Sequence, residues 1–197
     1  QNSEFQDKID SILDFKGYKT YFVSDLCKSL GLDSEDLTAA KSKLLSEFLA
    51  KSDVSIEPDA KLTAKGLKSS DKVVLFRPSA NNINLESWKS SVNLLDLSMS
   101  VALAEGSADN KEEEHTIDFI VRHFKLNKNE ATRLRFRTIL LKESKFSVSA
   151  LAKKLASTLT MKQGEAIAKF LFSIAALDGQ LDSEEIAVLE RSYKAFN

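Results

Sequence analysis

Acidic residues recur with the same spacing in two segments that lie 73 positions apart in the chain. In each segment an acid is followed at once by glycine, then by Asp after two residues and by Glu after two more. Three carboxylates on one short loop form a ligand set for a hard divalent cation such as Ca²⁺, Mg²⁺ or Mn²⁺, because these ions prefer oxygen ligands. The six candidate ligands are Glu105, Asp109 and Glu112 in the first segment and Asp178, Asp182 and Glu185 in the second.

Four of these six acids also have a purely structural role open to them. Asp109 and Asp182 stand where a side chain caps the next helix, and the Glu three residues later completes a capping box. Glu105 and Asp178 do not fit this role, because each closes a helix, where the macrodipole disfavours a carboxylate by about 0.3–1 kcal/mol. A bound cation would remove that penalty. The residues therefore leave two alternatives, a cation site or a metal-free acidic patch that meets a basic protein partner.

The segments that carry these tips have the period of amphipathic helices. Helices are expected over 84–104, 109–124, 127–141, from 147, over 160–177 and over 182–193. Asn84 is the predicted cap of the first of these helices, and Asn127 with Glu130 predicts a capping box at the start of 127–141. The repeat predicts that 85–104 with 109–125 superposes on 158–177 with 182–196. The expected fold is all-α, a pseudo-twofold bundle of two acidic-tipped helical hairpins.

A different pattern precedes this helical part. Short helices are expected up to Gly17 and from an N-cap at Ser24. A longer helix is expected from an N-cap at Ser34, and its apolar side is predicted to carry Leu37, Leu44, Leu45, Phe48 and Leu49. The alternating run 54–56 and the β-branched run 73–76 then predict a small two-stranded ribbon. A junction over 77–82 predicts two parts, residues 1–80 and residues 81–197.

Composition narrows the class of protein. The chain has 197 residues, 43% hydrophobic and 29% charged, with a net charge of −1 and only six Gly and two Pro. This balance argues against a turn-rich all-β fold and against a bulk polyanion-binding domain. Its one cysteine, Cys27, permits no intrachain disulfide. No membrane span and no signal peptide are apparent, so a cytoplasmic protein is expected.

The acidic segments resemble the TerB (tellurite-resistance) domain. The residues that carry the resemblance are Ala-Ala-Leu-Asp178-Gly179-Gln-Leu-Asp182-Ser-Glu-Glu185 and the matching run Ala-Leu-Ala-Glu105-Gly106-Ser-Ala-Asp109-Asn-Lys-Glu112. The likeness covers about Leu85 to Asn197, and 56–59 with 73–77 resemble the lead-in of larger proteins that join TerB to TerB-N and TerB-C regions. The resemblance implies a helical, non-enzymatic module of bacterial stress systems, with possible divalent metal binding at the tips. Glu105 departs from the family pattern, which usually has Asp there.

Three other functions are alternatives. Eight basic residues between Arg122 and Lys145, with Arg133 and Arg137 on one helix face, could contact nucleic acid. Glu130 and Glu143 lie among them and dilute their charge, so we expect a solvated surface rather than a nucleic-acid site. The two short helices around Gly31 followed by a ribbon could form a winged helix-turn-helix. A metal-dependent hydrolase at the tips is the weakest alternative, because the sequence shows no nucleophile paired with a general base and no nucleotide-binding or metalloprotease motif.

The pair Glu112 and His115 forms half of a di-iron motif, but the second copy has Val188 in place of the histidine.

Overall fold

A computed structural model describes residues 16–33, 35–78, 82–102 and 110–143, with isolated positions at 7, 10–12, 14, 169, 170, 172 and 190; the side chains of 100, 101 and 112 are not described. The chain divides into two compact units, residues 1–81 and 82–197. The junction expected from the sequence lies one residue from this division. No helix in the part of the chain that is described combines the length and the apolar character needed to cross a membrane.

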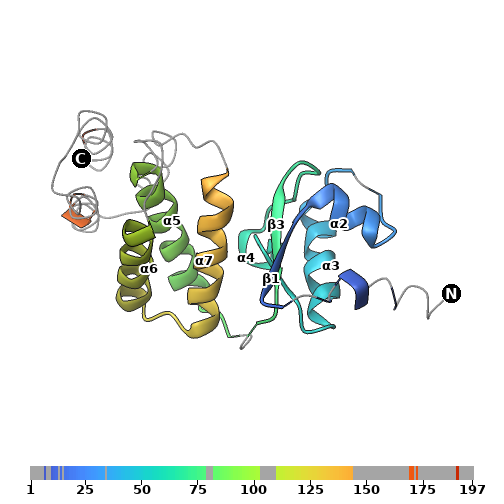
Figure 1. The fold of residues 1–197 in the computed structure, drawn as a ribbon, viewed down its shortest axis with the longest axis horizontal. Coiled ribbons are helices and arrows are strands. Elements are labelled where there is room, and N and C mark those ends of the chain that lie inside the picture. Colours follow the sequence, from blue (N-terminus) through green and yellow to red (C-terminus); the bar gives the residue numbers. More distant parts are fainter. Residues whose placement is uncertain are drawn as a thin grey trace. The chain divides into compact units, whose positions relative to one another are not determined.

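The first unit is built on a three-stranded antiparallel sheet (Figure 1). Its elements in chain order are β1 (Tyr18–Phe22), α2 (Val23–Ser29), α3 (Ala39–Ala50), β2 (Ser55–Glu57), α4 (Ala60–Thr63) and β3 (Lys72–Phe76). The strand order is β1-β3-β2. The expected ribbon is confirmed, because β2 pairs with β3 and places Ile56 opposite Leu75. The strand β1 was not expected from the sequence, and it pairs with the other edge of β3.

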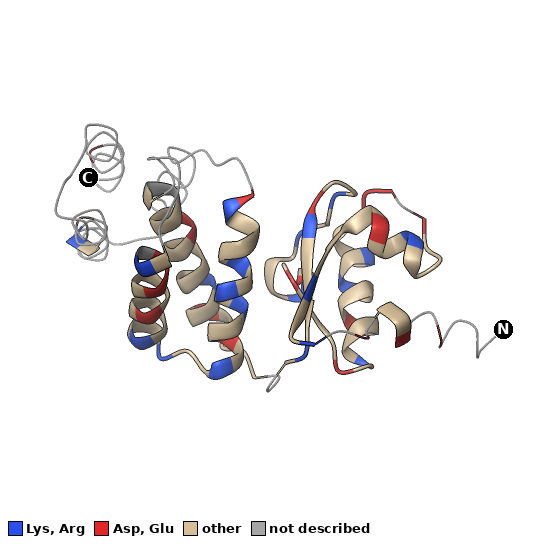
Figure 2. Cartoon of the chain, viewed as in Figure 1, with Lys and Arg blue, Asp and Glu red and all other residues tan. Residues whose placement is uncertain are grey.

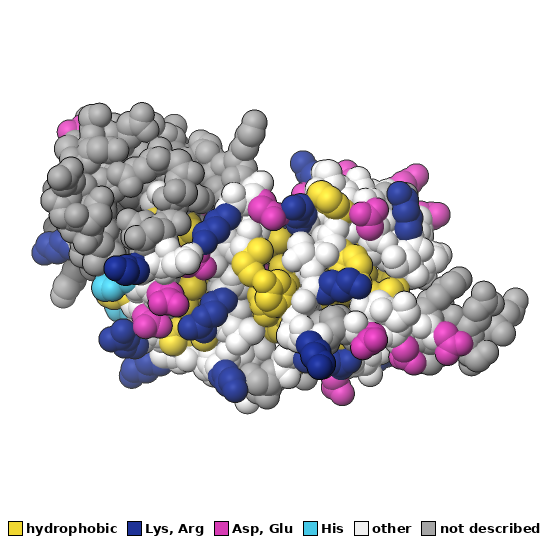
Figure 3. All heavy atoms as spheres, viewed as in Figure 1, with side chains coloured by type: hydrophobic (Ala, Val, Ile, Leu, Met, Phe, Trp, Pro, Cys, Tyr) yellow, Lys and Arg dark blue, Asp and Glu magenta, His cyan; other side chains and the backbone are white. Residues whose placement is uncertain are grey.

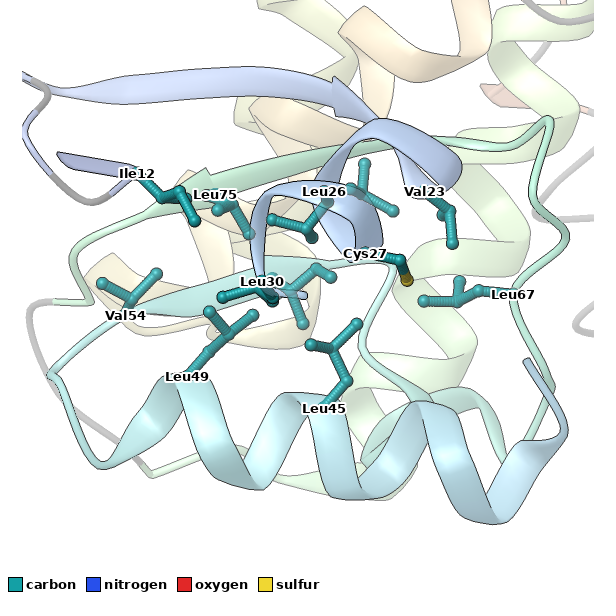
Figure 4. Close-up of a cluster of buried hydrophobic side chains, with 12 residues drawn as sticks. Ile12, Val23, Leu26, Cys27, Leu30, Leu45, Leu49, Val54, Leu67 and Leu75 are labelled. Carbon is teal, nitrogen blue, oxygen red and sulfur yellow. The ribbon is translucent and has the colours of Figure 1, made fainter. Parts of the chain in front are cut away.

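The core of the first unit lies between the sheet and the helices α2 and α3 (Figure 4). Val73 and Leu75 alternate toward this core from β3, as the two-residue period of a strand requires. Leu45 and Leu49 enter it from α3, where their spacing of four residues puts them on one helix face. Cys27 lies within the same cluster and is fully buried.

Two expected helix starts in this unit are wrong. Helix α2 begins at Val23 rather than after Ser24, because its first two amides donate to distant carbonyls, Val23 N to Asp71 O at 2.9 Å and Ser24 N to Ser69 O at 3.0 Å. A side-chain cap is therefore not needed there. Helix α3 begins after Thr38, whose hydroxyl accepts from the backbone N–H of Lys41, and not after Ser34.

The apolar face expected for α3 also needs one correction. Leu44 was assigned to that face, yet 64% of its surface is exposed. The buried face of the helix instead follows Ser42, Leu45, Ser46 and Leu49. Ser42 replaces an apolar residue there because its hydroxyl accepts from Leu67 N at 3.0 Å.

The second unit contains three described helices, α5 (Leu85–Ala102), α6 (Asn110–Phe124) and α7 (Lys128–Lys142). Helix α5 packs against both α6 and α7, and these two helices also contact each other. Residues 94–99 of α5 are buried in sequence without a gap, so α5 is the central helix of the three. The expected helices over 84–104, 109–124 and 127–141 agree with this part of the unit. The helices expected beyond 147 lie outside the described residues, so the pseudo-twofold arrangement stays a prediction.

Candidate functional site

The candidate metal ligands fall between α5 and α6 in the chain, in the first turn of α6, and in the second acidic segment. Glu105 and Asp109 belong to 103–109, the segment between α5 and α6, which is outside the described residues, as are Asp178, Asp182 and Glu185. Glu112 lies in the first turn of α6, and its side chain is not described. Among the side chains that are described, no group of three His, Cys, Asp or Glu residues could hold a metal ion. The convergence of the six carboxylates therefore stays a prediction.

A buried ion pair joins α5, the helix that precedes the first acidic segment in the chain, to α7. Arg137 donates to both carboxylate oxygens of Asp96, from Nε at 2.7 Å and from an Nη at 2.6 Å. The side chain of Arg137 is 18% exposed and that of Asp96 is 8% exposed. A bidentate guanidinium–carboxylate pair of this kind sets both the distance and the rotation of the two helices.

A second polar contact joins α6 to α7. Glu113 accepts from the hydroxyl of Thr138 at 2.9 Å and forms an ion pair with Lys142. Glu113 is the middle residue of the acidic run 112–114, and this contact directs it toward α7. The run is therefore not a uniformly exposed acidic face, since one of its three carboxylates is held within the bundle.

The carboxylate of Glu130 joins the start of α5 to the start of α7. Glu130 is 3% exposed, and its two oxygens accept from the backbone N–H groups of Asn84 at 2.9 Å and Asn127 at 2.8 Å. Asn127 completes the predicted capping box of α7, and Asn84 caps α5 by accepting from Ser87 N at 3.1 Å. Both predicted caps are confirmed, whereas the bridge that Glu130 makes to Asn84 was not expected.

The residues chosen for the nucleic-acid alternative do not line a surface. Arg133 is 3% exposed, and Arg137 is engaged with Asp96. Arg135 is exposed. Arg122 is also exposed, and an Nη of its guanidinium lies 3.6 Å from a carboxylate oxygen of Asp118. Figure 2 shows the basic positions on α7, and Figure 3 shows acidic and basic side chains interspersed over α6 beside the histidines. The basic segment was expected to be solvated. Arg133 and Arg137 do not meet this expectation, whereas the other described basic residues of the segment are exposed: Arg122, Lys125, Lys128, Arg135 and Lys142.

The ion pair between Asp96 and Arg137 is a structural contact that the sequence interpretation missed. A signal was present, because Asp96 is the one charged residue in the apolar run 94–99 of α5. Burying an unpaired carboxylate is energetically costly, so a carboxylate within a buried apolar run needs a partner. A basic residue on a neighbouring helix could therefore be expected. The partner itself, 41 residues away, could not be identified from spacing.

The pKa is shifted at Cys27 and at Asp36. Burial raises the pKa of the Cys27 thiol above its usual value, which makes it a poor nucleophile. Hydrogen bonds from Ser69 lower the pKa of Asp36, whose carboxylate accepts from the backbone N–H of Ser69 at 2.7 Å. His115, the histidine of the half di-iron motif, is exposed on α6.

Comparison with known proteins identifies the second unit. Searches of curated proteins and of solved structures found no match. The family model of the tellurite resistance protein TerB matches residues 91–197, from the second turn of α5 to the last residue, and so includes both acidic segments. Because this match covers more than half of the sequence, the chain belongs to the TerB family of tellurite resistance proteins.

Proposed function

We propose that this chain is a non-catalytic module of a bacterial stress or tellurite-resistance system that binds a divalent cation through its acidic tips. The observation that carries the proposal is the extent of the TerB match, which spans both copies of the acid–Gly–Asp–Glu pattern. A binding role is favoured over hydrolysis, because the sequence offers carboxylates at the tips but no nucleophile paired with a base.

The chemistry of the second tip supports a cation. Asp178, Asp182 and Glu185 are separated by only a few residues, so their charges repel one another in the absence of a counter-ion. Asp178 also follows a predicted helix, whose C-terminal dipole adds to the repulsion. A hard divalent cation would offset both effects and would be bound by oxygen alone.

A rigid hairpin would favour binding at the first tip. The described part of that hairpin is held by Asp96 with Arg137 and by Glu113 with Thr138. Because α5 and α6 are both held against α7, the described residues on either side of 103–109, Ala102 and Asn110, belong to helices that are held in place. Fixed flanking helices reduce the entropy that a connecting segment loses when it binds an ion.

Thermal melts test this proposal. The wild type, Asp178→Asn and Asp182→Ala are melted with EDTA and with Ca²⁺, Mg²⁺ or Mn²⁺. Wild type is expected to gain about 2.7 kcal/mol at a hundredfold excess of cation over Kd, because the ion binds the native state alone. Asp178→Asn should lose the response without losing metal-free stability, whereas Asp182→Ala should lose about 1 kcal/mol even in EDTA because it removes a helix cap.

The competing outcome is also defined. If no ion shifts the wild-type melt at millimolar concentration, the cation proposal fails and the tips are helix caps on an acidic, partner-facing patch. In that case a basic protein partner becomes the better candidate for the ligand, and charge reversal at Asp178 should abolish its binding.

A further inference from the structure

The first unit has the element order of a winged helix-turn-helix domain. Beginning with the helical residues 10–12, it continues through β1, α2, α3, β2 and β3, and its antiparallel sheet has the order β1-β3-β2. In this arrangement α3 is the helix that enters a DNA groove, and the β2–β3 connection is the wing. The segment 30–38 between α2 and α3 is longer than the usual turn, and the connection contains α4.

Charge is unevenly distributed within this unit. Residues 1–38 contain eight acidic and four basic residues, whereas 39–77 contain eight basic and five acidic ones. Two of those five acids, Glu57 and Asp59, are 1% and 2% exposed, and Asp71 accepts from the backbone N–H of Lys68 at 2.8 Å. On α3 and on the β2–β3 connection basic residues outnumber acidic ones by one each, and two of the lysines are paired, Lys43 with Glu47 and Lys61 with Asp59, which leaves Lys41, Lys65 and Lys68.

A close backbone approach brings these two segments together. Leu37 N donates to Leu67 O at 2.8 Å, in an isolated antiparallel bridge. A Cβ on Gly66 would lie 2.3 Å from Leu37 O and 3.2 Å from Ala39 N, so glycine is required for this contact. The connection is thereby fixed against the N-terminal end of α3.

Three exposed lysines are placed at that end of α3. Lys65 and Lys68 flank the bridge in the connection, and Lys41 lies in the first turn of the helix. The positive end of the helix dipole adds to their field. The exposed Glu35 and Asp36 offset part of this charge, and the hydrogen bond from Ser69 N favours the ionised form of Asp36.

The side chains of α3 define the kind of contact. The helix has twelve residues and so is about 18 Å long, and the major groove of B-form DNA admits a helix. Its sequence contains no Arg, Asn or Gln, the residues that most often read base edges, and its outward face includes Ala40 and the exposed Leu44. Lysine contacts to phosphates position a protein on DNA without reading its sequence.

We propose that the first unit binds double-stranded DNA without sequence preference, through phosphate contacts from Lys41, Lys65 and Lys68. The site is separate from the acidic tips, so this inference does not depend on the proposed cation binding.

Fluorescence anisotropy with the full chain tests the inference. The probe is a labelled 20-base-pair DNA duplex, titrated between about 50 and 200 mM salt, and a second duplex of scrambled sequence should bind equally well. The variant with Lys41→Gln, Lys65→Gln and Lys68→Gln should bind roughly tenfold more weakly at the lowest salt. Its slope of log K against log salt should fall by about 2.7, the value for three lost phosphate contacts.

A matched control removes the same net charge from the second unit. The variant with Lys89→Gln, Lys125→Gln and Lys128→Gln alters three exposed lysines there and should bind like the wild type. Circular dichroism melts check that both variants are folded. The proposal is overturned if the wild type does not bind the duplex at 50 mM salt, or if the two triple variants weaken binding equally.

Discussion

Removal of the Glu130 carboxylate should destabilise two helix starts at once. Glu130 is 3% exposed and accepts from the backbone N–H groups of Asn84 and Asn127, at the starts of α5 and α7. A hydrogen bond to a charged group contributes about 1.5–3 kcal/mol. Asn84 and Asn127 are themselves exposed, so water can replace part of each lost bond. We therefore expect Glu130→Ala to lower the free energy of unfolding by about 2–4 kcal/mol. Glu130→Gln keeps one acceptor oxygen and should cost about half as much.

Urea unfolding followed by tryptophan fluorescence measures this effect. Trp88 is the one tryptophan of the chain, is 2% exposed and lies in the first turn of α5, where its backbone N–H donates to Asn84 O at 2.8 Å. It therefore reports on the end of the bundle that Glu130 holds. Glu114→Gln is the control, because it removes the same charge from an exposed position on α6. If Glu130→Ala and Glu114→Gln differ by less than about 0.5 kcal/mol, the carboxylate does not hold the two helix starts together.

Three further predictions concern other contacts. Gly66→Ala should cost about 1–3 kcal/mol in urea unfolding, because the new methyl group would lie 2.3 Å from Leu37 O; an unchanged midpoint would show that the two segments do not meet as described. Asp96→Ala should cost about 3–5 kcal/mol, because it leaves Arg137 half-buried without its bidentate partner, and Asp96→Ala combined with Arg137→Met should recover part of this loss. Cys27 is buried, and burial raises the pKa of its thiol, so a thiol reagent at pH 8 should modify it roughly tenfold or more slowly in the native chain than in denaturant; equal rates would contradict its burial.

Local signals in the sequence predicted most of the second unit that the structure describes. Helix starts at Asn84 and Asn127 could be identified because the capping side chain and the amide that it accepts from lie within three residues of each other. The ribbon of β2 and β3 was predicted for a similar reason, since each strand has its own β-branched pattern. These features depend on short stretches of chain and so are visible without a fold.

Contacts between distant residues account for what the sequence did not predict. Strand β1 pairs with β3 across 50 to 58 residues, and the first amides of α2 donate to the carbonyls of residues 69 and 71. Asp96 and Arg137 show the same limit, because either residue alone has the appearance of an ordinary helix charge. The arrangement of the six tip carboxylates is of this long-range kind, and for this reason it stays a prediction about residues 103–112 and 178–185.

Equilibrium dialysis against Ca²⁺, Mg²⁺ or Mn²⁺, with the metal content of each compartment measured, tests the cation proposal most directly. The full chain is first freed of metal with EDTA, and Asp178→Asn serves as the comparison. Because the second tip combines two Asp and one Glu at close spacing, we expect the wild type to retain at least one cation per chain at micromolar to millimolar free metal. Asp178→Asn should retain less. Equal metal on both sides of the membrane for every ion, up to millimolar concentration, would contradict the proposal that these tips bind a cation.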